Sequence, residues 1–179
     1  MASTIVTFVL GDREVEVMVK PMTTLQSALR NQLGYAAVKE GCRQGGCGSC
    51  LVLVDGAPML SCLLPVEDVA GRHVTTLETI TPPEGLHPIQ QAFVDCYAMQ
   101  CGYCTPGMVM VSKALLDHNP SPTRDEIAEA LAGNICRCTG YAPIVRAVSV
   151  AAAALATGAR PSKGALVGDV TIAEGGQGR

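Results

Sequence analysis

Cysteine spacing is the feature of this sequence that most restricts its fold and its chemistry. Cys42, Cys47 and Cys50 follow the pattern C-x4-C-x2-C, and Cys62 comes twelve residues after Cys50. This is a known ligand spacing for a 2Fe-2S cluster held by four thiolates. The loop is also rich in glycine, at Gly41, Gly45, Gly46 and Gly48. Because glycine permits positive φ angles and has no side chain, the backbone can approach a cluster closely. The four cysteines are therefore predicted metal ligands.

A second group of four cysteines lies in the other half of the chain. It consists of Cys101-x2-Cys104 and Cys136-x-Cys138, and it leaves only Cys96 unassigned among nine cysteines. By spacing alone this group could hold a structural zinc ion as well as an iron–sulfur cluster. Cys96 falls on an apolar stripe, where the role of a small buried hydrophobe is expected.

Composition restricts the alternatives. The odd cysteine count and the closely spaced pairs disfavour a disulfide framework. The N-terminus, Met-Ala-Ser-Thr-Ile-Val, does not resemble a secretion signal, so a cytoplasmic location is expected. The net charge is −3, from 13 basic and 16 acidic residues, which gives no basic face for nucleic acid. The longest apolar stretch, 148–156, is too short to span a membrane.

The sequence of the first half of the chain predicts a set of strands packed against one helix. Two hairpins are expected, Thr4–Leu10 with Glu14–Val19 across Gly11-Asp12, and Leu51–Val54 with Ala57–Leu60 across Asp55-Gly56. A helix capped by Thr23 or Thr24 should bury Leu25, Ala28, Leu29 and Leu33 and stop at Gly34. The last strand is expected at His73–Leu77. This pattern indicates a β-grasp, ferredoxin-like domain over residues 1–80.

The second half predicts a four-helix bundle over residues 84–157, after a Pro/Gly linker at 81–85. The expected helices run from Pro88 up to Gln100, from Thr105 to Asn119, from the Thr123/Glu126 capping box to Gly133, and onward from Pro143. The cysteines lie at the joints between these helices. From residue 158 to 179 the chain is rich in Gly, Ser and Ala, which predicts a loose tail or one that contacts a partner. The fold class is therefore α+β.

Two longer motifs surround the second cysteine group. They are Gln-Cys-Gly-Tyr-Cys-Thr-Pro-Gly at 100–107 and Gly-Asn-Ile-Cys-Arg-Cys-Thr-Gly-Tyr at 133–141. With these motifs the chain resembles the small iron–sulfur subunit of the molybdenum hydroxylases, the family of xanthine oxidase, aldehyde oxidase and carbon monoxide dehydrogenase. The resemblance covers about residues 4–155 and includes all eight ligand positions.

This resemblance implies an electron-transfer subunit with no catalytic residue of its own, within a molybdenum-containing oxidoreductase. Two 2Fe-2S clusters would pass electrons from molybdopterin, in its cytosine dinucleotide form, in a large subunit to FAD in a medium subunit. The expected assembly is a dimer of heterotrimers. Cys42, Cys47, Cys50 and Cys62 would hold the flavin-side cluster, and Cys101, Cys104, Cys136 and Cys138 the molybdenum-side cluster. Gln100 would hydrogen-bond the pterin through its amide, and Cys138 would approach the pterin most closely.

The chain departs from the common family pattern at Arg43-Gln44 and Gly45-Gly46, where bacterial relatives often carry an acidic or hydroxyl residue after the first cysteine. Two rival functions remain open from the residues alone: a zinc-stabilised interaction module, and a free-standing ferredoxin with two clusters. Tyr103 and Arg137 lie inside the two longer motifs and could either shield the molybdenum-side cluster or have a packing role. His73, His87 and His118 are interpreted as surface or capping residues.

Overall fold

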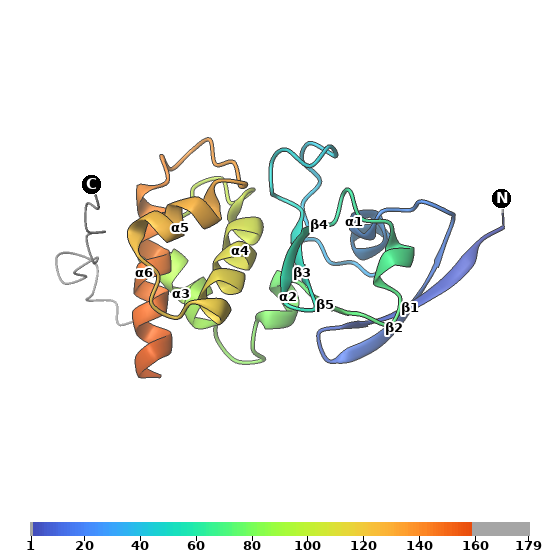
Figure 1. Cartoon of the computed structure of the whole chain (residues 1–179), viewed down its shortest axis with the longest axis horizontal. Coiled ribbons are helices and arrows are strands. Elements are labelled where there is room, and N and C mark those ends of the chain that lie inside the picture. Colours follow the sequence, from blue (N-terminus) through green and yellow to red (C-terminus); the bar gives the residue numbers. More distant parts are fainter. Residues whose placement is uncertain (1, 159–179) are drawn as a thin grey trace, which may run out of the picture.

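The computed structural model describes residues 2–158. It has two lobes side by side, a β-sheet lobe built by the first half of the chain and a helical lobe built by the second (Figure 1). The α+β fold class and the order of the two lobes agree with the sequence prediction. Apart from Gly158, the tail predicted for 158–179 lies outside the described residues.

The sheet contains both predicted hairpins. Its strands are β1 (Thr4–Leu10), β2 (Arg13–Val19), β3 (Leu51–Val54), β4 (Ala57–Leu60) and β5 (His73–Thr75), in the order β2-β1-β5-β3-β4. β1 and β5 are parallel, and the other neighbours are antiparallel. In the β3–β4 turn, Asp55 and Gly56 have φ angles of 50° and 81°, as a tight two-residue hairpin turn requires.

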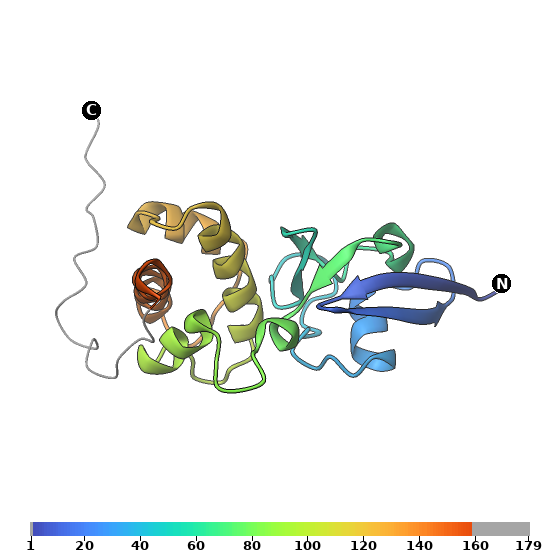
Figure 2. The ribbon, with the colours of Figure 1, turned by 90° about the horizontal axis from the view of Figure 1, so that it is seen from below.

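The predicted helix lies on one face of this sheet (Figure 2). It begins as α1 (Leu25–Ser27), where the amide of Ser27 donates to Thr24 Oγ1, and continues as a wider π-helical segment, η1 (Ala28–Gln32). Leu25 and Leu29 are fully buried in the same core as Phe8 of β1. The cap and the apolar face are thus confirmed, whereas the π-helical winding was not predicted.

Between the two lobes the structure corrects the expected last strand. β5 ends at Thr75, and Leu77 starts a short helix, α2 (Leu77–Ile80). The chain turns because the amide of Thr76 donates to Thr79 Oγ1 (2.9 Å), so it is not available to a neighbouring strand. A 3-10 helix, η2 (Val66–Val69), also lies in a segment for which no element was predicted.

The helical lobe contains α3 (Pro88–Asp95), α4 (Thr105–His118), α5 (Arg124–Leu131) and α6 (Ala142–Thr157). The capping box is confirmed, because the Thr123 amide donates to Glu126 Oε2 and the Glu126 amide to Thr123 Oγ1. The prediction that the first helix reaches Gln100 is wrong. α3 ends at Asp95, and Tyr97 has a left-handed φ of 52°. Within the described part of the chain, no helix has the length and apolar character needed to cross a membrane.

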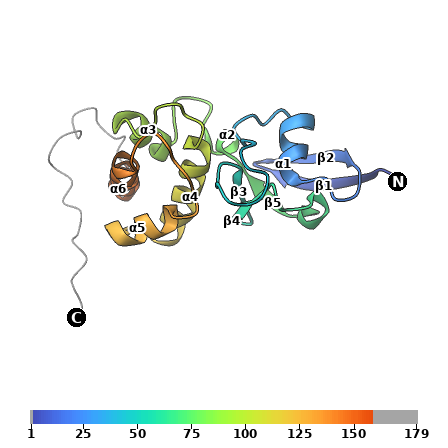
Figure 3. The same cartoon turned by 90° about the horizontal axis from the view of Figure 1, so that it is seen from above.

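Strand β3 connects the two hydrophobic cores. All of its residues are buried. Side chains alternate between the two faces of a strand, so successive residues of β3 enter different cores. Val52 and Val54 belong to the core under α1, while Leu51 and Leu53 join the helical core. Helix α4 is the bundle helix that lies against the sheet (Figures 2 and 3). The two lobes are therefore packed together directly rather than tethered only by the linker.

Candidate iron–sulfur centres

The first cysteine loop, residues 41–50, leads into β3 and is fixed by polar contacts at both ends. Before the loop, Gln26 Nε2 donates to the carbonyl of Lys39 (2.7 Å). After the loop, the buried Ser61 hydroxyl donates to the carbonyl of Cys50 (2.6 Å). The four thiols lie in two pairs. Cys42 is within hydrogen-bonding reach of Cys47, and Cys50 is within reach of Cys62.

The second cysteine group is assembled from two connecting segments of the bundle. Cys101 and Cys104 come from the α3–α4 connection, and Cys136 and Cys138 from the α5–α6 connection. Here too the thiols form pairs, with Cys138 Sγ 3.6 Å from Cys101 Sγ, and Cys104 in contact with Cys136. All nine cysteines are free thiols, and Cys96 lies apart, buried in the helical core.

This donor set fits a diiron cluster at each group. Cysteine sulfur is a soft ligand, and in a 2Fe-2S cluster each of the two irons takes two protein ligands. The thiols of this chain lie in such pairs. Over residues 2–158, no group of three or more His, Cys, Asp or Glu side chains is placed to hold a single metal ion. Among the described residues Thr105 Oγ1, next to Cys104, is buried without a hydrogen-bond partner. A sulfide of a bound cluster would offer it an acceptor.

The thiols differ in how readily they lose a proton. Hydrogen bonding from the backbone of Gln44, with a further contribution from Cys47, lowers the pKa of Cys42 to about 7. Burial raises the pKa of Cys50 to about 11 and that of Cys104 to about 12. At Cys136 burial acts in the upward direction, but hydrogen bonds led by the Thr139 hydroxyl lower the pKa overall. Because metal-bound cysteine is a thiolate, iron binding must release protons from Cys50 and Cys104.

The two cysteine groups meet at a junction between the lobes, on the upper edge of the molecule in Figure 1. The amide of Ile135 donates to the carbonyl of Cys47 (3.0 Å), and Asn134 Nδ2 donates to the carbonyl of Gly48 (3.1 Å). Tyr103 contributes a third contact, because its hydroxyl donates to the carbonyl of Glu40 (2.7 Å). Members of both groups line one shared cavity of about 360 Å³, namely Cys42, Cys47, Cys101, Cys104, Cys136 and Cys138.

The remaining predicted site residues differ in exposure. Gln100, Cys101 and Cys138 are exposed, while Cys50 and Cys62 are buried in the sheet lobe. Arg137 is exposed, and Arg43 forms an ion pair with Glu40 at the start of the first loop. Exposed cysteines are thus concentrated in the helical lobe.

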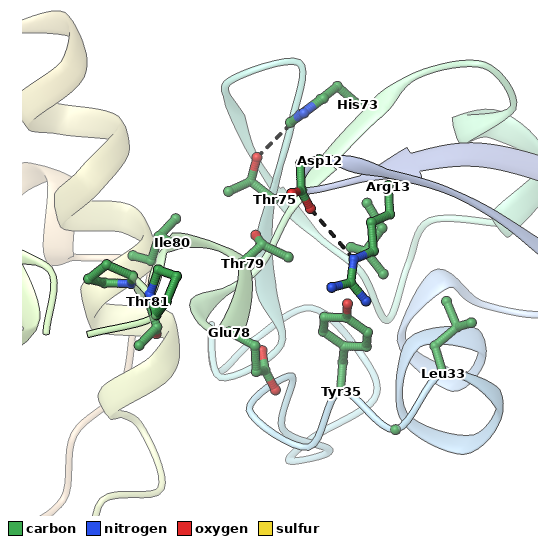
Figure 4. Close-up of a pocket in the computed structure, with 15 residues that line it drawn as sticks. Asp12, Arg13, Leu33, Tyr35, His73, Thr75, Glu78, Thr79, Ile80 and Thr81 are labelled. Atoms are coloured by element: carbon green, nitrogen blue, oxygen red, sulfur yellow. Dashed lines mark hydrogen bonds and ion pairs between the residues drawn. The ribbon is translucent and has the colours of Figure 1, made fainter. Parts of the chain in front are cut away.

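A larger cavity of about 660 Å³ lies away from the cysteines, between the β1–β2 turn and α2 (Figure 4). Tyr35 and Glu78 form part of its wall. Glu78 Oε1 also accepts a hydrogen bond from the amide of Ala37 (2.7 Å), so α2 holds the segment that leads into Cys42. Sequence reasoning missed this role of Glu78, because the contact joins residues 41 positions apart and belongs to no motif.

Comparison with known proteins agrees with the two-lobe arrangement. Residues 8–74 match the family described as "2Fe-2S iron-sulfur cluster binding domain", and residues 76–149 match "[2Fe-2S] binding domain". Nicotinate dehydrogenase small FeS subunit of Eubacterium barkeri is 43% identical over 135 residues, which cover 75% of this chain and 86% of that protein. Nicotine 6-hydroxylase small subunit of Paenarthrobacter nicotinovorans is 46% identical over 139 residues, covering 78% and 84%.

A solved structure shows the same fold. Quinoline 2-oxidoreductase from Pseudomonas putida 86 contains a chain that superposes with a TM-score of 0.84 at 39% identity, covering 87% of this chain and 98% of that one. These matches define a two-domain 2Fe-2S protein. The chain belongs to the molybdenum hydroxylase family, as one of its small iron–sulfur subunits.

Proposed function

We propose that this chain relays electrons singly, through two 2Fe-2S clusters, from molybdopterin in a large partner subunit to FAD in a medium subunit. The observation that carries the proposal is the shared junction: cysteines of both groups border one cavity. A backbone hydrogen bond also joins the two loops there. Two one-electron centres at such a junction would lie in series, which is what a relay requires.

The thiol pairs indicate which cysteines share an iron. In the sheet lobe, Cys42 and Cys47 would bind one iron and Cys50 and Cys62 the other. In the helical lobe, the two pairs would be Cys101 with Cys138 and Cys104 with Cys136. The proposed domains remain 1–80 for the first cluster and 84–157 for the second. When bound, each cluster supplies one-electron redox chemistry, and the chain supplies position and environment.

The exposed residues of the helical lobe support an orientation. Gln100 and Cys138 are both exposed, so they are available to a cofactor in a partner subunit. We place the molybdopterin, as its cytosine dinucleotide, against these two residues, and the FAD subunit nearer the loop of Cys42. The complex would be a cytoplasmic dimer of heterotrimers. The names of the small-subunit relatives favour a nitrogen heteroaromatic substrate, selected by the large subunit.

Metal content and electron paramagnetic resonance (EPR) test the relay directly. The native complex, after reduction with dithionite, should contain about four iron atoms per chain and give two distinct rhombic signals, as two 2Fe-2S clusters do. Molybdenum and flavin should co-purify with the chain. Zinc without an EPR signal would instead indicate a zinc-stabilised module. A chain that purifies with iron but without molybdenum and flavin would be a free-standing ferredoxin.

The proposed pterin contact predicts the effect of one substitution. Gln100→Ala should reduce the molybdenum content of the complex, or alter the EPR signal of the helical-lobe cluster more than that of the sheet-lobe cluster, because the amide that donates to and accepts from the pterin is lost. Gln44→Ala is the matched control, since Gln44 is an exposed glutamine in the other cysteine loop. Unchanged molybdenum content and unchanged spectra in Gln100→Ala would show that Gln100 does not contact the pterin.

A further inference from the structure

In each cysteine group a side-chain hydroxyl lies within hydrogen-bonding distance of a thiol. Ser49 Oγ lies 3.1 Å from Cys47 Sγ, and Thr139 Oγ1 lies 3.1 Å from Cys136 Sγ. We propose that these two hydroxyls tune the reduction potentials of the two clusters separately, each by donating a hydrogen bond to a ligand sulfur. The proposal rests on the two-cluster relay described above and adds residues that set its energetics.

The direction of both hydrogen bonds follows from the chemistry of the ligand. An iron-bound thiolate has no proton, so its sulfur can only accept. At Thr139 the oxygen already accepts from the amide of Tyr141 (3.2 Å), which leaves the hydroxyl hydrogen for the sulfur of Cys136.

At Ser49 the surroundings enclose the hydroxyl. Ser49 is only 4% exposed. A Cβ atom added at Gly41 would lie 2.7 Å from Ser49 Oγ and 2.9 Å from Cys47 Sγ. The absence of a side chain at position 41 is therefore what allows the hydroxyl and the sulfur to sit together beneath the loop. The donor side of this hydrogen bond is therefore shielded from bulk water, and a poorly solvated hydrogen bond acts more strongly on the charge of its acceptor.

A donor to a ligand sulfur favours the reduced cluster. Reduction adds one electron, converts one ferric iron to ferrous, and leaves the bonds to the ligands in place. The added negative charge resides partly on sulfur, so a hydrogen bond there stabilises the reduced state and raises the potential. Removing the hydroxyl should lower the potential of its own cluster. A loss of about tenfold in the one-electron equilibrium corresponds to about 59 mV.

The two positions should shift the balance between the clusters in opposite directions. In a complex that has taken up one electron, loss of the Ser49 hydroxyl should move that electron toward the helical-lobe cluster. Loss of the Thr139 hydroxyl should move it toward the sheet-lobe cluster. A general loosening of the fold would not produce two opposite shifts. This opposition separates tuning of the potential from a purely structural role.

The test is a redox titration followed by EPR on the native complex. Ser49→Ala should lower the potential of one signal by about 59 mV, and Thr139→Val that of the other signal, the tenfold change of a one-electron couple. Thr139→Ser keeps a hydroxyl and should keep the wild-type potential. Ser112→Ala is the control, because the buried Ser112 hydroxyl donates to a carbonyl inside α4, that of Met108 (2.7 Å).

If one of these variants loses its iron, a second substitution at the same position provides the measurement. Ser49→Gly and Thr139→Ala also lack the hydroxyl but differ in volume, and they should shift the same signal in the same direction. The inference is overturned if the potentials match those of Ser112→Ala, if both signals shift together, or if every hydroxyl-free variant at a position loses its iron. Failure of the relay itself is distinguishable, because the wild-type complex would then lack one or both signals.

Discussion

Backbone amides, rather than charged side chains, lower the pKa of the Cys42 thiol in the first loop. The amide of Gly46 donates to Cys42 Sγ (3.3 Å), and hydrogen bonding from the backbone of Gln44 makes the largest contribution to its lowered pKa. These amides point inward because Arg43 and Gly45 adopt left-handed conformations, with φ angles of 56° and 79°. Successive amides that converge in this way form an anion-binding nest, which suits a negatively charged cluster.

Two neighbouring glycines in this loop should respond differently to substitution. At Gly45 the left-handed φ disfavours any side chain by about 1–2 kcal/mol. An added Cβ would lie 2.5 Å from Leu63 Cδ1, but this exposed side chain can move away, so the backbone conformation carries the cost. Gly45→Ala should therefore lower the stability of the loop and the iron content of the purified protein. Gly46→Ala is the control, because an added Cβ there meets no atom within 4 Å and the amide is retained. Equal iron content in the two variants would contradict this account of the loop.

Elements with a local sequence signal were predicted well. The Thr123/Glu126 box located the start of α5, and Asp55-Gly56 located the β3–β4 hairpin. The failures occur where the backbone is set by distant contacts. Tyr97 is left-handed without being a glycine, so nothing local indicated that α3 ends before it.

The same reasoning applies to the site. The first four cysteines were predicted as cluster ligands from their spacing. The second four were assigned through the resemblance of the motifs around them, because their spacing alone also suits zinc. The junction could not be predicted, since Asn134 and Gly48 are 86 residues apart and meet only through the packing of α4 on β3. The pairing of the thiols and the two hydroxyl contacts also depend on the folded loops. These contacts could be identified only from the folded structure.

Helix α4 offers a substitution for which helix propensity and packing predict opposite signs. Gly→Ala inside a helix usually stabilises by about 0.5–1 kcal/mol. At Gly107, however, an added Cβ would lie 2.3 Å from the carbonyl oxygen of Gly48, an atom of the first cysteine loop. A backbone carbonyl cannot rotate away as a flexible side chain can, so the loop and the helix must separate. Asn134 Nδ2 would then lose its hydrogen bond to this carbonyl, at about 0.5–1.5 kcal/mol, while the Leu51 amide still donates to it.

Gly107→Ala should therefore destabilise the protein and disturb both EPR signals, because it separates the two cysteine groups. Chemical unfolding and EPR of the same preparation measure the two effects. Gly133→Ala is the matched control in the same junction, since its added Cβ meets no atom within 4 Å. A Gly107→Ala variant as stable as the wild type would show that α4 does not need its close approach to Gly48.

At the scale of the whole molecule, two hydrophobic cores share strand β3, while six of the nine cysteines border the cavity at the junction between the lobes. The segments that carry most of the ligands have no regular secondary structure, and Cys101 and Cys138 are exposed. Packing therefore holds the sheet and the bundle, and bound iron would hold the loops between them. This division of labour predicts that the metal and the cores stabilise different parts of the chain.

Hydrogen exchange with and without iron tests this division. The amide of Ile135, which donates to the carbonyl of Cys47 across the junction, should exchange much faster after iron is removed, because both of its loops lose their cross-links. The amides of Val52 in β3 and Ala147 in α6 should stay protected, since both residues are fully buried in a core. Anaerobic reconstitution with iron and sulfide should restore the protection of Ile135. If all three amides lost protection together, the cores would depend on the metal and the lobes would not be held by packing alone.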